Sequence, residues 1–321
     1  MIDRSVLEAA APHALRVTHL EGVGTRLQGK VRDLYLQEGR RVLVASDRLS
    51  AFDRIIAAIP YKGQVLNQLS AWWFEQTADV VGNHVIDVPD PNVTIGAEAQ
   101  ALPVEVVVRG YITGVTDTAL WTLYNEGVDK PYGLTLPAGL VKNDRLPEPV
   151  ITPTTKGGPG EHDERLSSDE VVSRGILSPE LWGKVQTAAL EIFRRGQEVA
   201  DKAGMILVDT KYEFGLIDGQ LVLIDEVHTP DSSRYWRQDD YAEAHPLGRE
   251  PEGLDKEYVR RWLASTGYRG EGEVPPLPMD VTCELAARYI DAYERLTGRV
   301  FEPGEQPPEP RIARALSSYR V

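Results

Sequence analysis

Alternating apolar and polar residues predict β-structure in the first part of the chain. Residues 30–36 alternate in this way, the turn-like 37–39 follows, and 42–45 are all apolar, so we expect a β-hairpin. A β-branched run at 104–108 lies between a proline and a glycine, which is typical of a buried strand. We place a soft domain boundary before this run, at 103/104.

Apolar residues at helical spacing predict helices elsewhere. Within 64–80 four large apolar residues share one face, and 178–203 opens with Ser-Pro and ends before a glycine, the usual helix start and stop signals. A third apolar stripe runs through 281–296, bracketed by proline-rich stretches. Segment 127–165 is rich in Gly, Pro, Asn and Asp and is expected to be mostly loop.

A second hairpin is predicted near residue 218. Strands are expected at 205–209, 212–217 and 220–226, and the Asp-Gly pair at 218–219 is a strong two-residue turn. Such a turn pairs 217 with 220, 213 with 224 and 211 with 226. Together these elements predict an α+β fold of mainly antiparallel sheets with flanking helices.

Charged side chains gather at the far end of this hairpin. Lys211 and Glu213 alternate along one strand and so share a face, which the predicted register extends to Glu226. Asp225 points the other way unless a bulge intervenes, and Gly215 is a plausible bulge position. Carboxylates this close need a cation to stay ionised, and oxygen ligands favour Mg²⁺ held together with substrate phosphates. The alternative is a salt-bridge cluster around Lys211.

Composition narrows the class of protein. The 321 residues carry a formal net charge of −14 with no segment dense in Lys and Arg, so nucleic-acid binding is not expected. Cys283 is the only cysteine, which rules out an intrachain disulfide and a multi-cysteine zinc site. No apolar run reaches the roughly 18 residues of a membrane span. We therefore expect a cytoplasmic protein that binds no membrane.

One glycine-rich stretch invites comparison with the phosphate-binding P-loop. Residues 24–30 match the start of the Walker pattern, but Val31 stands where Ser or Thr should hold Mg²⁺, and a strand follows where the motif requires a helix. A P-loop is therefore excluded. What remains is Gly29 before Lys30 on a hairpin, as in folds where a hairpin closes over nucleotide phosphates. An exposed lysine on a surface hairpin is the alternative.

Other polar residues leave two interpretations open. Ser50 and Asp53 lie in a polar loop that suits substrate binding or turn capping. Arg109 ends a buried strand, which suits bidentate binding of phosphate or carboxylate, although an arginine that extends to water fits equally well. Acids flank His162, but adjacent residues in a flexible loop rarely form a metal site.

Seven stretches together resemble the phosphoribosylaminoimidazole-succinocarboxamide synthase family, also called SAICAR synthetase. In the family's order they are GKVRDLY (29–35), SDRLSAFD (46–53), KGQVLNQLSAWWF (62–74), VEVVVRGYITG (104–114), TPTTKGGPGEHDE (152–164), VDTKYEFGL (208–216) and DEVHTPDSSRYW (225–236). Seven stretches in order are highly specific. The length is similar to that of the longer members, which carry a C-terminal extension.

The resemblance implies an ATP-dependent ligase of purine biosynthesis. It would join L-aspartate to the carboxylate of carboxyaminoimidazole ribonucleotide (CAIR) through an acyl phosphate, giving SAICAR, ADP and phosphate. The implied fold has two lobes and is related to ATP-grasp enzymes. Residues 1–103 would form a lobe that covers the nucleotide, and 104–321 a lobe that binds ATP and substrates and ends in a helical extension.

The resemblance also implies roles for individual residues. ATP would be bound by Gly29, Lys30, Arg32, Glu105 and Lys156, with Lys62 a weaker candidate. Mg²⁺ would be held by Glu213 and Asp225, with Glu226 as the alternative to Asp225. The substrates would be bound by Ser50, Asp53, Arg109, Ser232, Ser233 and Arg234, with Lys211, Asp231 and Arg234 at the reacting centre.

One stretch departs from the family. After Gly114 many members carry a serine and then a tryptophan, whereas here the chain reads VTDTALW. Either Thr116 or Thr118 replaces that serine.

Two other functions would share parts of this sequence pattern. A ligase of the same chemistry that uses another amine or acid would differ only in its substrate dependence. A non-catalytic nucleotide-binding protein predicts loss of the acids or lysines, yet Lys30, Lys211, Glu213 and Asp225 are all present. For a ligase, the expected partners are the small molecules ATP, CAIR and L-aspartate, and the expected state is a monomer or homodimer.

Overall fold

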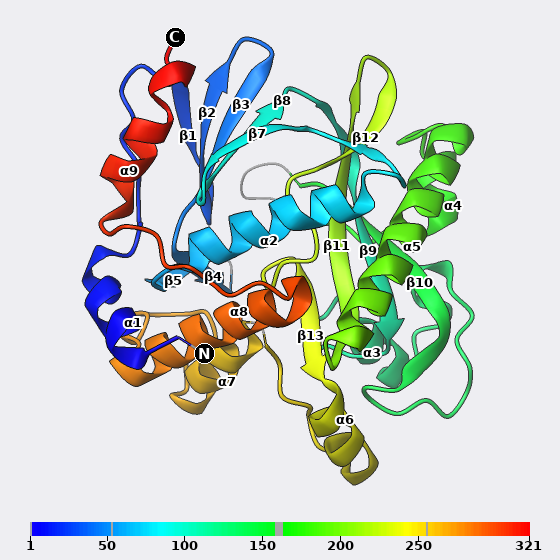
Figure 1. The fold of residues 1–321 in the computed structure, drawn as a ribbon. Helices are drawn as coiled ribbons and strands as arrows, with labels where there is room; N and C mark the ends of the chain where they lie inside the picture. Colours follow the sequence, from blue (N-terminus) through cyan, green and yellow to red (C-terminus); the bar gives the residue numbers. More distant parts are fainter. Residues whose placement is uncertain (1, 53, 158–162, 255) are drawn as a thin grey trace.

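Two β-sheets with helices packed around them make up the computed structural model, which describes residues 2–52, 54–157, 163–254 and 256–321 (Figure 1). The smaller sheet has neighbouring strands antiparallel throughout. In spatial order it contains β1 (Thr25–Gln28), β2 (Arg32–Gln37), β3 (Arg40–Ala45), β8 (Val93–Ala97) and β7 (Val85–Asp90). The hairpin predicted from 30 to 45 is therefore confirmed as β2–β3.

The larger sheet is built around one long strand, β11 (Met205–Ile217). Its order is β10 (Arg145–Thr155), β9 (Gln100–Tyr111), β11, β12 (Gln220–Ile224) and β6 (Gly82–Asn83), with β13 (Ser233–Arg237) also pairing with β11. All these pairs are antiparallel except β6 with β12. A separate hairpin joins β4 (Arg48–Ala51) to β5 (Arg54–Ala58).

Nine α-helices of the described residues complete the fold. They are α1 (Arg4–Ala10), α2 (Lys62–Thr77), α3 (Leu120–Asn125), α4 (Ser168–Ser173), α5 (Pro179–Lys202), α6 (Gln238–Ala244), α7 (Glu257–Ser265), α8 (Met279–Thr297) and α9 (Pro308–Ala315), with short 3₁₀ turns at Ala11–His13, Pro131–Gly133, His245–Leu247 and Ser317–Tyr319. The three helices predicted from apolar spacing correspond to α2, α5 and α8. One hydrophobic core connects these helices to the larger sheet.

Helix α2 crosses between the two sheets, and α8 lies beside it (Figure 1). The start of α2 comes unusually close to β3, because a Cβ on Gly63 would lie 2.2 Å from the carbonyl oxygen of Ala45. Only glycine fits this approach. Near the two ends of the chain, α1 packs against α8 and α9 packs against β7.

Several details differ from the pattern-based expectation. Most described residues of segment 127–165 lie outside helices and strands, as expected, but the segment also contains β10, which the pattern did not predict. Its three prolines are tolerated because β10 lies at the edge of the sheet, where a missing N–H breaks no ladder. The strands predicted at 205–209 and 212–217 form one strand. The boundary predicted at 103/104 falls inside β9, and the division into lobes stays a prediction.

The hairpin register is confirmed as far as residue 224 but not beyond it. Ile217 pairs with Gln220 and Glu213 with Ile224, as the two-residue turn requires. The expected pairing of 211 with 226 is wrong, because β12 ends at Ile224 and Asp225 turns the chain away with a φ of +70°. An irregularity near Gly215 is present, but it lies between β11 and β9, so it does not turn Asp225.

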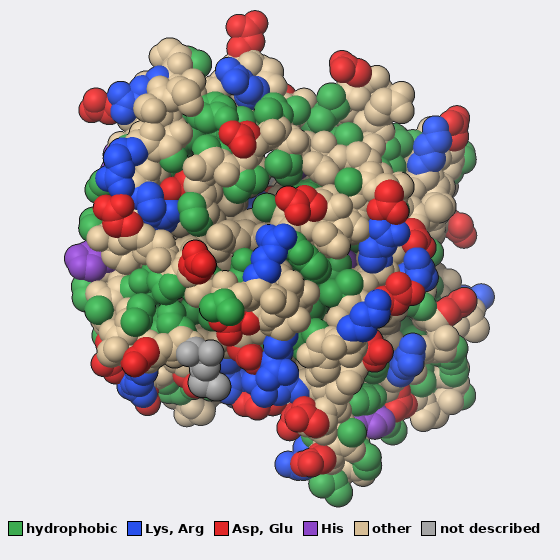
Figure 2. All heavy atoms as spheres, viewed as in Figure 1, with side chains coloured by type: hydrophobic (Ala, Val, Ile, Leu, Met, Phe, Trp, Pro, Cys, Tyr) green, Lys and Arg blue, Asp and Glu red, His purple; other side chains and the backbone are tan. Residues whose placement is uncertain are grey.

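The surface is mixed in charge on the face seen in Figure 2, where acidic and basic side chains are interspersed. Among the described residues, no helix is both long and apolar enough to cross a membrane.

Candidate active site

The polar stretch after β12 lies beside the middle of β11. Strand β9 pairs with one edge of β11, and the other edge is shared by β13, along its first half, and β12, along its second. The loop 225–232 joins β12 to β13 and so crosses this edge where the two partners separate. Here the backbone N–H of Lys211 donates to the carbonyl of Ser232 over 2.9 Å. Tertiary pairing thus brings the predicted acids and serines to Lys211.

Two lysines and two glutamates form a charged group on β9, on β11 and at the residue just after β10. The Nζ atom of Lys211 lies 2.7 Å from an Oε of Glu105 and 2.8 Å from an Oε of Glu213, and Lys156 also contacts Glu213. Burial opposes ionisation of Glu213, but the two lysines prevail and lower its pKa to about 2. Burial likewise opposes the charge on Lys211, yet the surrounding carboxylates raise its pKa. Lys211 and Glu213 therefore stay ionised at neutral pH.

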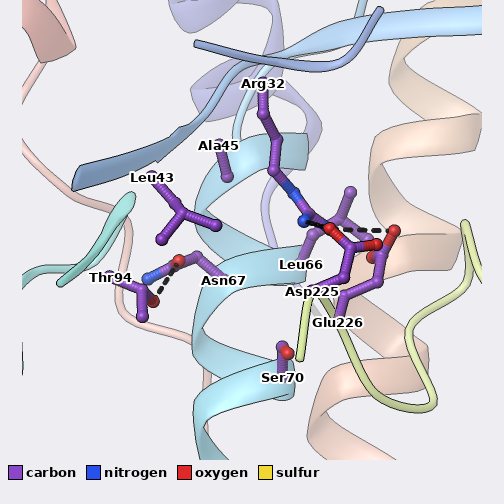
Figure 3. A pocket seen from close by; sticks show the side chains of 9 residues that line it. All are labelled: Arg32, Leu43, Ala45, Leu66, Asn67, Ser70, Thr94, Asp225 and Glu226. Carbon is purple, nitrogen blue, oxygen red and sulfur yellow. Dashed lines mark hydrogen bonds and ion pairs between the residues drawn. The ribbon is translucent and has the colours of Figure 1, made fainter. Parts of the chain in front are cut away.

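Arg32 connects this group to the smaller sheet. It extends from β2 to contact Asp225, and one of its terminal nitrogens lies 2.9 Å from an Oε of Glu226 (Figure 3). Burial raises the pKa of Glu226, although Arg32 opposes the shift. Asp225 and Glu226 thus contact the same arginine. These contacts do not require the predicted pairing of residue 211 with residue 226.

Three carboxylates near Lys211 and Arg32 are the candidate ligands for Mg²⁺. Among the described residues, no three His, Cys, Asp or Glu side chains gather as a metal site. Glu213, Asp225 and Glu226 supply only oxygen, the ligand type that Mg²⁺ prefers, and each is neutralised here by Lys or Arg. Their chemistry fits Mg²⁺ if phosphate oxygens complete its coordination and take over the cationic side chains.

A cationic pocket of about 390 Å³ lies beside the first half of β11, where Arg109 and Arg234 pair with Asp209. Its described lining carries five cationic side chains and two carboxylates, although the whole chain is acidic. They are Arg109, Lys142, Arg234, Arg260 and Arg261, with Glu250 and Glu257. Asp209 lies between two of the arginines, 3.4 Å from a nitrogen of Arg109 and 3.8 Å from one of Arg234. Cations outnumber carboxylates in this lining, so the pocket suits an anion.

Thr116 and Thr118 are placed differently with respect to this pocket. Thr116 lines it together with Gly114, whereas Thr118 is not part of the described lining. The two hydroxyls lie 3.4 Å apart. Position therefore favours Thr116 as the replacement for the family's serine.

The two predicted serines make contacts within the loop and the sheet. The hydroxyl of Ser233 is buried and lies 2.8 Å from that of Thr210. The hydroxyl of Ser232 accepts from the backbone N–H of Thr229 over 3.2 Å. Ser233 directly precedes Arg234 on β13, whereas the Ser232 hydroxyl holds the loop that leads to it.

Asp231 is enclosed rather than open to water. Its carboxylate oxygens meet Lys62 at 2.7 Å and the hydroxyl of Tyr289 at 2.8 Å, and Lys256 donates to its backbone carbonyl over 3.1 Å. Burial alone would raise the pKa of Asp231, but Lys62 and Lys256 lower it to about 2. The weaker candidate Lys62 is thus a partner of Asp231 in this structure.

The turn that carries Gly29 and Lys30 is held by an arginine that sequence reasoning missed. Arg48 is nearly buried and donates to the carbonyls of Gly29 and Lys30 over 3.1 and 3.0 Å. It also pairs with the buried carboxylate of Asp33 at 2.8 Å. The Lys30 side chain is exposed at this turn. Arg48 lies in the SDRLSAFD stretch, so the resemblance of this stretch to the family could have indicated it.

The remaining candidates lie apart from these groups or outside the described residues. Ser50 is half-buried on β4, where it pairs with Ile55 of β5. Asp53 and His162 lie outside the described residues. Sequence reasoning also missed Tyr289, which donates to Asp231. In the sequence it was only one member of an apolar helical stripe, and such a pattern does not show that a tyrosine hydroxyl has a polar partner.

Comparison with known proteins identifies the family. The family model described as SAICAR synthetase matches residues 25–276. The phosphoribosylaminoimidazole-succinocarboxamide synthase of Legionella pneumophila (strain Lens) is 50% identical over 292 residues, which cover 90% of this chain and 93% of the relative.

Solved structures agree with the sequence match. SAICAR synthase from Saccharomyces cerevisiae, in complex with SAICAR, superposes with a TM-score of 0.79 at 32% identity and covers 90% of this chain and 100% of that one. A SAICAR synthetase in complex with ADP has a TM-score of 0.65 at 25% identity, covering 87% and 100%. This chain therefore belongs to the SAICAR synthetase family, the ATP-dependent ligases that condense CAIR with L-aspartate in purine biosynthesis.

Proposed function

We propose that this chain carries out the ligation through an acyl phosphate, with its two charged regions dividing the work. The carboxylate of CAIR attacks the γ-phosphorus of ATP and releases ADP. The amine of L-aspartate then attacks the acyl carbon, phosphate leaves, and the amine loses a proton. The carbon of a free carboxylate is a poor electrophile. Phosphorylation of one carboxylate oxygen lets that oxygen leave as part of phosphate. The observation that supports this division is that one strand, β11, carries Lys211 and Glu213 at one site and Asp209 at the other.

The nucleotide would occupy the region around Arg32 and Lys211. Gly29, Lys30, Arg32, Glu105 and Lys156 are the proposed ATP-binding residues. Glu213 and Asp225 are the proposed ligands of Mg²⁺, with Glu226 as the alternative to Asp225. When bound, Mg²⁺ would neutralise phosphate charge. Lys156 and Arg32 already meet these acids, so phosphate oxygens could replace the acids as their partners.

The ribonucleotide would occupy the cationic pocket. Arg109 and Arg234, helped by Ser232 and Ser233, are proposed to bind its phosphate and carboxylate, and Thr116 lines the same pocket. Ser50 and Asp53 stay proposals from the family resemblance. The excess of cations over carboxylates in the lining supports an anionic substrate.

The protonation states suggest what Lys211 and Asp231 do. The raised pKa of Lys211 keeps it protonated, so it would neutralise negative charge that develops on the acyl phosphate. With a pKa of about 2, Asp231 is a weak base and would orient neighbouring cations instead of accepting a proton. We keep the predictions that the enzyme is a monomer or homodimer and that it acts in the cytoplasm.

The direct test is ADP release from the purified protein with Mg²⁺, ATP and CAIR, with and without L-aspartate. We expect SAICAR to appear together with ADP only when all substrates are present. ¹⁸O placed in the CAIR carboxylate should appear in the released phosphate, because the acyl-phosphate oxygen leaves with phosphorus. ADP release that ignores aspartate would point to another amine, and unlabelled phosphate would exclude the acyl phosphate.

Replacing Arg234 by lysine should raise the KM for CAIR about 10- to 100-fold, since a hydrogen bond to a charged group contributes about 1.5–3 kcal/mol. The KM for ATP should stay within a factor of two. Steady-state kinetics with each substrate varied in turn provides the measurement. Arg195→Lys is the matched control, because Arg195 forms an exposed ion pair with Asp79 at the surface. Equal increases in both KM values would contradict the placement of CAIR in this pocket.

A further inference from the structure

The carboxylate of Asp231 is held between two helices from distant parts of the chain. Lys62 is the first residue of α2 and binds one oxygen, while Tyr289 of α8 donates its hydroxyl to the other. The Lys62 and Tyr289 side chains are fully buried, and that of Asp231 is 6% exposed. Because α2 and α8 lie side by side, both contacts belong to one packed unit (Figure 1).

The Tyr289 contact comes from outside the family match. Lys62 and Asp231 lie within residues 25–276, which match the family model, whereas α8 begins after them. Helix α8 thus reaches a residue that the proposed mechanism uses. The contact is polar and specific, so it is more than the packing of an apolar stripe.

A carboxylate bound through one oxygen can still rotate about its Cβ–Cγ bond. A second bond to the other oxygen removes this freedom, and catalytic groups must be held within about 0.5 Å and 10–20° of the productive geometry. The ring of Tyr289 also lies 5.9 Å from Nζ of Lys62, where its face favours the ammonium charge. One side chain therefore steadies both members of the ion pair.

We propose that Tyr289 is a positioning residue of the ligase reaction, whose hydroxyl fixes the orientation of Asp231 so that helix α8 completes the active site. This inference rests on the proposed role of Asp231 at the reacting centre. A purely structural role makes a different prediction, because a loosened site would raise the KM of the substrates and lower the melting temperature. Loss of positioning lowers kcat instead.

The test compares Tyr289→Phe with Tyr293→Phe in the full-length protein. Tyr293 lies one turn further along α8, is also buried, and packs its ring against Phe301; its hydroxyl forms no hydrogen bond with any residue that the structure describes. Tyr289→Phe should lower kcat between about tenfold and a hundredfold. Its KM values for ATP and CAIR should stay within twofold, and its melting temperature should stay close to that of Tyr293→Phe.

Asp231→Asn separates failure of this inference from failure of the proposed function. If Asp231→Asn loses turnover while Tyr289→Phe behaves like Tyr293→Phe, Asp231 acts without Tyr289 and the inference is wrong. If Asp231→Asn retains full turnover, the proposed role of Asp231 is wrong and the inference fails with it. A fall in kcat for Tyr289→Phe that is matched by higher KM values and a lower melting temperature would also overturn positioning, in favour of a structural role.

Discussion

Replacing Glu213 by glutamine should lower kcat about a thousandfold, because loss of one preorganised electrostatic contact costs about 10²–10³-fold in other enzymes, and Glu213 pairs with Lys211 and would hold Mg²⁺. Glutamine keeps the size of the side chain but removes the charge that faces Lys211 and Lys156. If Glu213 binds Mg²⁺, its loss also weakens the metal's hold on the phosphates. Steady-state kinetics over a range of Mg²⁺ concentrations measures both effects.

Glu191→Gln is the matched control for this change. Glu191 pairs with Arg194 on the exposed face of α5, far from the proposed chemistry, so its loss should leave kcat unchanged. The melting temperature of Glu213→Gln should show that the fold survives. Near-normal turnover of Glu213→Gln at ordinary Mg²⁺ would favour the other interpretation of the sequence, a salt-bridge cluster around Lys211.

Replacing Arg48 by methionine should destabilise the fold by about 3–5 kcal/mol, the usual cost of removing one partner from a buried ion pair. Arg48 is 3% exposed and its partner Asp33 is fully buried, so the carboxylate cannot turn to water. The carbonyls of Gly29 and Lys30 would lose a donor as well. Denaturant-induced unfolding, followed to its midpoint and slope, measures the free energy of unfolding.

Arg41→Met provides the comparison for Arg48. Arg41 lies on β3 and forms a partly exposed pair with Glu98 at 3.3 Å, which should contribute no more than about 1 kcal/mol. Arg48→Met should therefore unfold at a clearly lower denaturant concentration than Arg41→Met. Equal midpoints would show that the charge on Arg48 is not needed to hold the turn that carries Lys30. Arg48→Met should also raise the KM for ATP if the turn that carries Lys30 binds phosphate.

Local patterns were reliable where one short segment contains the whole cause of a structure. The turn at 218–219 set the register of β11 and β12, because a two-residue turn leaves only one pairing. Ser178 and Pro179 started α5 because a serine hydroxyl caps the first turn and a proline lacks only an N–H that would have no partner. In contrast, β10 was not predicted, because its prolines argue against a strand. They are tolerated only because β10 lies at the edge of the sheet, and the sequence does not show that position.

The candidate site shows the same division. The residue types, and their order along seven stretches, identified the family and its chemistry from the sequence. The pairing of Arg32 with Asp225 and Glu226 was not predicted, since it spans almost 200 residues and depends on how the two sheets meet. The predicted extension of the hairpin to residue 226 was wrong for a related reason. The backbone turns at Asp225, whose side chain contacts Arg32, and does not continue the alternation of the strand.

The sequence by itself determined two hairpins, three long helices, the acidic and basic stretches and the family, because these depend on spacing along one chain and on motif order. The tertiary structure alone decided which charges meet. It placed the loop 225–232 against Lys211 by pairing β12 and β13 with the same edge of β11, and it brought Tyr289 of α8 to Asp231. Such contacts follow from packing of the whole core, where segments remote in sequence share one buried volume.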